Sequence, residues 1–268
     1  MAAHDESQRH LRAMEGLMRN KVAVASARLV QLVPMIGDAQ GGCDLAGLAP
    51  VAADERTKRV IVIRHGQATH NAAAAASPHK CDCERDTPSG LCPYIDPALE
   101  DPGLTELGEA QAAQAAGFLA QAAIERVLVS PLRRTLQTAR VALASSFAAA
   151  VPAVAIEDAR EQFGQHTPDR RRDIGTAKEE FKLVDFSRIA SGPDRHWTEA
   201  RESKANLAER ASNLIRTLFE FPEKRICLVS HSSLILTMLN VSLDVDTPAG
   251  ASWFQPGECR IYDLTINL

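Results

Sequence analysis

The chain has 268 residues, which is long enough to bury the core of one α/β domain with a further appendage. Its formal net charge of −4 at pH 7 argues against a protein that binds nucleic acid through bulk positive charge. No stretch reaches the roughly 18 consecutive apolar residues of a membrane-spanning helix, so we expect neither nucleic acid nor a membrane as a partner.

Residues 1–58 are predicted to form an N-terminal helical extension and a linker, ahead of a domain over 59–268. The stretch 5–33 is compatible with a helix that Pro34 ends, because apolar residues recur in it at helical spacing. These residues are Leu11, Met14, Leu17 and Met18. Several glycines before residue 50 indicate a flexible connector. We interpret the region as a packing helix and linker rather than as a targeting segment.

From residue 59 onward, short β-branched runs alternate with amphipathic helical segments. Strands are expected at 60–64, 127–129, 151–156 and 226–229, with a final edge strand at 260–266. Helices are expected from Thr105 to about 122, after Ser130, across 207–218 and after Ser232. This alternation predicts a three-layer α/β sandwich, in which helices cover both faces of a mainly parallel sheet.

Three of the expected strands end in residues that suit an anion. They end at Arg64-His65, at Ser130 ahead of Arg133 and Arg134, and at Ser230-His231. Parallel strands place these ends at one edge of the sheet, where α/β proteins bind ligands. Helix N-termini after the later two strands add free N–H groups and a favourable dipole. The pattern therefore predicts a phosphate pocket in which imidazole and guanidinium groups converge.

Four segments give the chain a resemblance to the histidine phosphatase superfamily, in its phosphoglycerate-mutase-like group. In the family's order they are RHGQATHN (64–71), LTELG (104–108), SPLRRTLQTA (130–139) and VSHSS (229–233). The segment REQFG (160–164), with arginines after it, is similar to a plant and fungal branch. The resemblance implies a phosphoglycerate-mutase-like fold, with 59–268 as a histidine phosphatase domain.

The resemblance also implies a role for each residue of the predicted pocket. His65 would be the nucleophile and would form a phosphohistidine. Arg64 and Arg134 would clamp the phosphoryl oxygens, and His231 would complete the pocket as a further catalytic residue. Asn71 would hydrogen-bond a phosphoryl oxygen. Because arginines stabilise the charge of the phosphoryl group, hydrolysis without a metal is implied.

Glu161 would protonate the leaving oxygen and then activate the hydrolytic water. Glu157 and Asp158 compete for this role, and the spacing within the motif favours Glu161. Two neighbouring arginines compete in the same way. The spacing of the third motif selects Arg134 for the phosphate, so Arg133 is expected on the helix surface.

The other histidines and one serine pair give further expectations. His65 must be neutral to attack, and its second ring nitrogen is expected to donate to a backbone carbonyl. His70 is expected to line the pocket, whereas His166 and His196 are expected to be ordinary loop histidines. Serines at 232–233 replace a glycine found in many relatives. This difference bears on the identity of the substrate more than on activity.

The insert between residues 76 and 104 combines three cysteines with a histidine. These residues are His79, Cys81, Cys83 and Cys92. Cysteine and histidine together suit zinc, but a Cys-X-Cys pair strains a tetrahedral site. We therefore prefer a loop with free or redox-sensitive thiols, and we expect neither a metal site nor a cofactor.

These observations predict a phosphatase that hydrolyses a phosphomonoester of a small metabolite through a phosphohistidine. The alternatives are a phosphoglycerate mutase and a catalytically silent phospho-ligand binding protein. The start of the chain lacks a secretory signal, and six cysteines in a chain of this length require no disulfide framework, so we expect a cytoplasmic protein. Loops over 72–103 and 164–198 would select the substrate. The sequence names neither that substrate nor an oligomeric state.

Overall fold

The computed structural model describes residues 2–21, 23–33, 50–83 and 89–267. The strands are β1 (Ala25–Val33), β2 (Thr57–Arg64), β3 (Arg126–Val129), β4 (Ala153–Ala155), β5 (Val184–Asp185), β6 (Arg225–Ser230), β7 (Leu243–Val245) and β8 (Cys259–Ile266). The helices are α1 (Ala2–Arg19), α2 (Thr69–Ala76), α3 (Glu106–Leu119), α4 (Arg133–Ala142), α5 (Ala144–Ala148), α6 (Ile174–Glu180), α7 (Lys204–Glu220) and α8 (Ser232–Thr237). None of the helices in these ranges is both long and apolar enough to cross a membrane.

The strands form a single sheet in the order β5-β4-β3-β6-β2-β8-β1-β7. The central strand β2 is parallel to β6, which is parallel to β3 in turn. The outer pairs β3–β4, β4–β5 and β1–β7 are parallel as well, and β8 runs antiparallel to β2 and β1. The prediction of a mainly parallel sheet is therefore confirmed.

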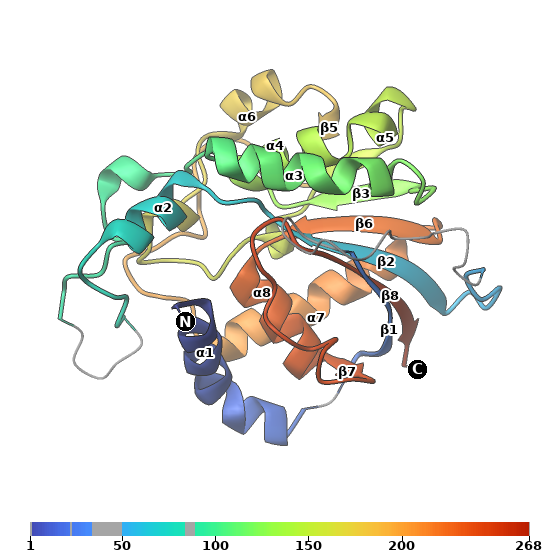
Figure 1. Cartoon of the computed structure of the whole chain (residues 1–268), viewed down its shortest axis with the longest axis horizontal. Helices are drawn as coiled ribbons and strands as arrows, with labels where there is room; N and C mark the ends of the chain where they lie inside the picture. Colours follow the sequence, from blue (N-terminus) through green and yellow to red (C-terminus); the bar gives the residue numbers. More distant parts are fainter. Residues whose placement is uncertain (1, 22, 34–49, 84–88, 268) are drawn as a thin grey trace.

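Helices cover both faces of this sheet, with α3 to α6 on one face and α7 and α8 on the other (Figure 1). Successive residues of a strand point to opposite faces. Ile61 and Ile63 of β2 accordingly join the apolar cluster under α3 and α4, while Val60 and Val62 join the cluster over α7. Burial on both faces explains the continuous apolar run of β2 and confirms the three-layer sandwich.

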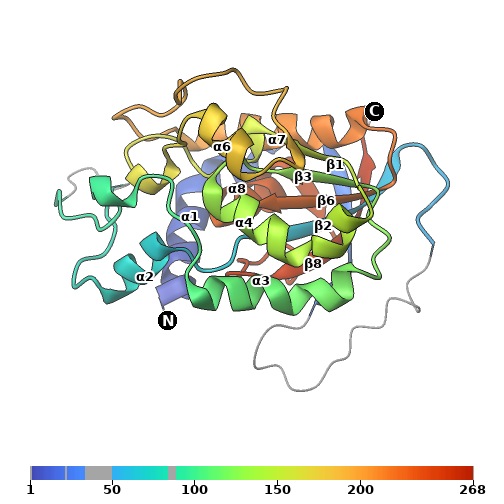
Figure 2. The same ribbon diagram turned by 90° about the horizontal axis from the view of Figure 1, so that it is seen from above.

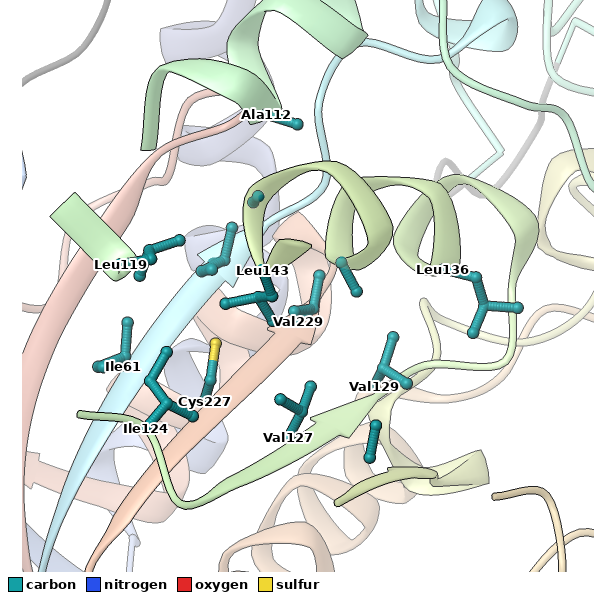
Figure 3. Close-up of a cluster of buried hydrophobic side chains, with 14 of the residues drawn as sticks. Ile61, Ala112, Leu119, Ile124, Val127, Val129, Leu136, Leu143, Cys227 and Val229 are labelled. Carbon is teal, nitrogen blue, oxygen red and sulfur yellow. The ribbon is translucent and has the colours of Figure 1, made fainter. Parts of the chain in front are cut away.

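The cluster between the sheet and α4 fixes the position of that helix. Figure 3 shows Val127 and Val129 of β3 and Val229 of β6 beneath the helix, with Leu136 of α4 on the other side of the cluster. Leu136 is 1% exposed. Since α4 is anchored through this apolar face, its first turn carries Arg134 to the carboxyl edge of the sheet.

The N-terminal region differs from the sequence-based expectation. Helix α1 ends at Arg19, so the prediction of a helix over 5–33 is wrong beyond that residue. Ala25–Val33 forms β1, whose main chain pairs with β8 on one side and with β7 on the other. Pairing on both sides satisfies the backbone N–H and C=O groups, and this tertiary gain outweighs a weak local preference for helix.

Helix α1 packs against the rest of the chain. Met14 is fully buried and joins a small apolar cluster with Ala208, Leu236 and Trp253. Figures 1 and 2 both place α1 and α2 at the end of the molecule away from the C-terminus. Most of the predicted connector falls at 34–49, outside the described residues. The division of the chain at residue 58 stays a prediction.

The last strand occupies a different place in the sheet from the expected one. The prediction of an edge strand over 260–266 is wrong in its position, because β8 lies between β2 and β1. The reason is that β1 and β7 extend the sheet beyond β8. Two other elements are shorter than expected: β4 covers Ala153–Ala155, and α3 ends at Leu119.

The chain leaves β2 through a close backbone contact with the start of α3. A Cβ atom at Gly108 would lie 2.0 Å from the carbonyl oxygen of Gln67, and one at Gly66 would lie 2.2 Å from the carbonyl oxygen of Gly108. The hydroxyl of Thr105 accepts from the N–H of Gly108 at 3.1 Å and donates to the side chain of Gln67 at 2.8 Å. The two glycines thus let the helix start hold the segment after His65.

We expect Gly108→Ala to lower the free energy of unfolding by about 1–3 kcal/mol, because the new methyl group must displace backbone rather than the tip of a side chain. Gly117→Ala is the matched control on the same helix: a Cβ there meets nothing within 4 Å. This control should gain up to about 1 kcal/mol from helix propensity. Urea unfolding measures both changes, and equal stability of the two variants would contradict the close contact.

Candidate active site

The ends of β2, β3 and β6 meet at one edge of the sheet, as the sequence predicts. Arg64 at the end of β2 pairs with Ser230 at the end of β6. The backbone N–H of the next residue, His65, donates to the carbonyl of Ser230 at 3.1 Å. The hydroxyl of Ser130, directly after β3, lies 2.8 Å from Nε2 of His231. The parallel register therefore brings both histidines to one place.

The two imidazoles lie side by side and are buried. The ring centroids of His65 and His231 are 5.0 Å apart. Nδ1 of His65 lies 2.7 Å from the carbonyl oxygen of Gly66. A carbonyl only accepts, so Nδ1 carries the proton and Nε2 carries the lone pair. The expected bond that fixes the tautomer is confirmed, and Nε2 is the nitrogen left for chemistry.

Burial and positive charge keep these rings neutral. Burial is the largest cause that lowers the pKa of His65 well below 6.5, and the charges of Arg134 and Arg64 lower it further. Burial and the charge of Arg134 lower the pKa values of His70 and His231 in the same direction. The imidazole at 65 is therefore in the form that attacks as a nucleophile near neutral pH.

The guanidinium groups of Arg64 and Arg134 are buried beside these rings. One nitrogen of Arg64 donates to the carbonyl of Phe254 at 2.6 Å. Arg134 donates to the carbonyl of Pro168 at 2.7 Å and to Oδ1 of Asp169 at 2.9 Å. Nε of each arginine is buried and has no hydrogen-bond partner within the described ranges. Both side chains are thus held in place while donors remain for an anion.

A cavity of about 400 Å³ opens at this edge of the sheet. Five residues proposed from the sequence line it: Arg64, His65, Asn71, Arg134 and Glu161. The sixth, His231, is fully buried and is not among the lining residues, although its ring lies next to that of His65. His70 also lines the cavity, which was its expected place. The structure therefore brings five of the six candidates to the cavity and places His231 in contact with one of them.

Asn71 is oriented by the start of α2. Its side-chain oxygen accepts from the backbone N–H of Ala68 at 3.0 Å. This bond uses the acceptor end of the amide and leaves its NH₂ group as the end that can donate. Asn71 thus presents a donor to the cavity, as hydrogen bonding to a phosphoryl oxygen requires.

Glu161 is a buried carboxylate held by several donors. Its Oε2 accepts from the N–H of Ser233 at 3.1 Å and from the hydroxyl of Ser232 at 3.3 Å, and its Oε1 accepts from the N–H of Gln162 at 3.0 Å. Burial raises the pKa of Glu161, but these N–H groups and the charge of Arg201 outweigh it and hold the pKa at about 2. The carboxylate is therefore ionised before any ligand binds.

The structure separates the residues that compete for these roles in the sequence. Glu157 accepts from Arg160 and from Arg171, and neither Glu157 nor Asp158 lines the cavity. Arg133 points away and pairs with Glu180 at 3.3 Å. Of the competing residues, Glu161 and Arg134 are the ones that face the cavity.

Much of the cavity wall comes from residues that the sequence analysis did not assign to the site. Helix α1 contributes one face, with Glu6, Arg9, His10 and Ala13 among the lining residues. Their spacing of three and four residues is that of one helix face. The sequence therefore shows that these residues share a helix face. It does not show which part of the chain that face packs against.

The remaining wall comes from loops. Tyr94, His166, Asp169 and Arg201 line the cavity, and Asp169 accepts from Arg201 at 2.9 Å as well as from Arg134. The expectation that His166 is an ordinary loop histidine is wrong, because its ring lies at the cavity and close to two cysteine sulfurs. These residues meet only in the folded chain, so their spacing gave no signal.

Comparison with known proteins identifies the family of this chain. The family model described as the histidine phosphatase superfamily (branch 1) matches residues 98–267. Phosphoglycerate mutase-like protein 1 of Arabidopsis thaliana is 30% identical over 224 residues, which cover 72% of this chain and 74% of that protein. A second phosphoglycerate mutase-like protein of the same plant is 30% identical over 220 residues, covering 72% and 77%.

Among solved structures, an ecdysone phosphate phosphatase from Bombix mori in complex with tungstate matches with a TM-score of 0.46 and 18% identity, covering 69% of this chain and 76% of that one. The family model begins after Arg64 and His65, so those two residues are placed by the strand register alone. The family match spans more than half of the sequence, and the chain belongs to the histidine phosphatase superfamily.

Proposed function

We propose that the protein is a phosphatase that hydrolyses a phosphomonoester through a phosphohistidine at His65. One observation carries the proposal: a neutral, buried imidazole, with Nδ1 bound to a backbone carbonyl and Nε2 left for chemistry, lines a cavity that two buried arginines also line. A phosphoryl group in that cavity would have a nucleophile and two sources of charge stabilisation around it. The two arginines supply that stabilisation, so the proposed chemistry needs no metal ion.

In the first step, Nε2 of His65 forms a bond to phosphorus and the bond to the leaving oxygen breaks. Charge spreads over the phosphoryl oxygens, which Arg64 and Arg134 stabilise together with the amide of Asn71. His231, held by its bond to Ser130 at 2.8 Å, stands next to the reacting ring. In the second step water attacks phosphorus, the nitrogen–phosphorus bond breaks, and phosphate leaves.

Glu161 would move the proton in both steps. Its carboxylate is ionised in the free protein, with a pKa of about 2. A phosphomonoester monoanion carries a proton into the cavity. Because the Glu161 carboxylate and the phosphoryl oxygens repel each other, a proton shared between these two groups is favoured. Glu161 then passes that proton to the leaving oxygen, and it takes one back from the attacking water.

The size and lining of the cavity support a small metabolite as substrate. A space of about 400 Å³ lies at the low end of the range for small-molecule sites. Arg9 and Arg12 of α1 add positive charge to its wall, and Tyr94 adds an aromatic ring. Because α1 and the insert wall the cavity, a small phosphorylated compound fits it better than a folded phosphoprotein does.

Replacement of the nucleophile tests the proposal. We expect His65→Ala to abolish turnover of p-nitrophenyl phosphate and to prevent formation of an acid-labile phosphoprotein, because no other neutral imidazole replaces Nε2 at that position. Circular dichroism should show that the variant is folded. Turnover retained in this variant rules the proposal out.

Two results with the wild-type protein would favour the alternatives. A requirement for added bisphosphoglycerate would favour the mutase, and phosphate binding without turnover would favour a silent binding protein.

The two adjacent arginines provide a matched pair of variants. We expect Arg134→Ala to lower kcat/KM by about 100-fold or more, because it removes a buried donor to the phosphoryl oxygens. Arg134→Lys should recover only part of the loss, since an ammonium lacks the planar fork. Arg133→Ala should stay within about twofold of the wild type, because its side chain is 41% exposed and pairs with Glu180. Steady-state kinetics that show equal effects at 133 and 134 would contradict the assignment.

The neutral state of His65 also predicts a pH dependence of stability. Its pKa in the folded protein lies well below 6.5, so the unfolded chain binds the extra proton as pH falls below about 6.5. The free energy of unfolding should then fall with pH, and His65 should contribute up to about 1.4 kcal/mol per pH unit. Urea unfolding at several pH values should show a shallower slope in His65→Asn. Identical slopes of the free energy of unfolding against pH in the two proteins would mean that folding does not lower the pKa of His65.

A further inference from the structure

The insert after α2 and the loop after β4 bring four soft ligand atoms together. Cys81, Cys83, Cys92 and His166 each offer one ligand atom, and these atoms all lie within 4.8 Å of one another. Nε2 of His166 is 3.4 Å from the sulfur of Cys81 and 3.7 Å from the sulfur of Cys92. We propose that these four residues bind one zinc ion as a closed structural site.

The observed distances suit tetrahedral coordination. Zinc binds sulfur at about 2.3 Å and nitrogen at about 2.0–2.1 Å, which places neighbouring ligand atoms about 3.6–3.8 Å apart. The two sulfur–nitrogen distances already lie close to this value, and small side-chain rotations would close the rest of the cluster. The Cys-X-Cys pair supplies two ligands, Cys92 of the same insert supplies the third, and His166 of the loop after β4 supplies the fourth.

The chemistry around the cluster also suits zinc. Three cysteine sulfurs with one histidine nitrogen form a donor set that is typical of structural zinc sites. Nδ1 of His166 lies 3.9 Å from Oδ2 of Asp169, on the other side of the ring from the sulfurs. A carboxylate behind a histidine ligand orients the ring and strengthens its nitrogen as a donor to the metal. The exposed His79, the histidine considered from the sequence, is not part of the cluster.

The site would join parts of the chain that form the cavity wall. Cys81 and His166 both line the cavity, and the carbonyl of Cys81 accepts a hydrogen bond from Arg9 of α1. The segment that starts at His166 continues through Pro168 and Asp169, which hold Arg134. A bound ion would therefore fix the insert against the loop that positions the phosphate-binding arginine.

Four protein ligands leave no open position for water or substrate, which distinguishes this site from a catalytic zinc centre. The proposed phosphoryl transfer therefore stays with His65, and the zinc site does not depend on that proposal. A disulfide between two of the cysteines is the competing state, and it would remove two of the four ligands.

The metal content of the full chain tests the site directly. Protein produced without a histidine tag, reduced, supplied with Zn²⁺ and passed through gel filtration should hold about one zinc per chain. Cys83→Ser and Cys92→Ser should each reduce the retained zinc at least about tenfold, because each removes a ligand. His79→Ala, in the same insert and outside the cluster, should keep about one zinc. Wild-type protein that retains no zinc, or variants that retain it fully, would overturn the proposal.

A second measurement does not depend on the folding of the variants. Co²⁺ added to the wild-type apoprotein should give tetrahedral d–d bands and a thiolate charge-transfer band, both displaced by Zn²⁺. Titration of thiols in the native zinc-loaded protein should find the three cluster cysteines protected until a chelator is added. An octahedral cobalt spectrum, or a disulfide in the cluster of the reduced protein, would show that the site does not exist.

Discussion

The buried ion pair between Arg134 and Asp169 determines the electrostatics of the cavity. Asp169 gives one oxygen to Arg134 and the other to Arg201, each at 2.9 Å. One carboxylate therefore serves two guanidinium groups, while Arg64 adds a third cation to the same cavity. Arg64 and Arg134 each bury an Nε that has no hydrogen-bond partner among the described residues, a cost that a bound anion would remove. The cavity thus favours a bound phosphate group. The hydrogen-bond partners of each arginine hold its guanidinium group in position.

Burial, neighbouring arginines and backbone N–H groups together set the protonation of the other groups in the cavity. Burial and the arginine charges keep His65 and His231 neutral, so the pocket does not accumulate further cations. Glu161 stays ionised because backbone N–H groups point at it. Nucleophile and proton carrier are therefore both deprotonated in the free protein, His65 through burial and neighbouring cations and Glu161 through the N–H groups that it accepts from.

The sequence predicted the part of the site that parallel strands position. Arg64, His65 and His231 lie at the ends of strands. Parallel pairing of these strands is enough to make the three residues neighbours. The prediction failed where the partner of a segment decides its structure. Ala25–Val33 becomes a strand only because β7 and β8 are there to pair with it. His166 meets Cys81 across 85 residues of sequence separation, a contact that no local pattern encodes.

The pocket therefore has two sources of rigidity. His65 and Arg64 are fixed by the sheet, whose hydrogen bonds hold the end of β2 between β6 and β8. Arg134 starts from an anchored helix, but its guanidinium group is held by Pro168 and Asp169, in a loop with one short helical turn. Such a loop lacks the paired strands that fix the rest of the site. A zinc ion bound through His166, the residue that opens this turn, would supply there the constraint that the sheet supplies to the nucleophile.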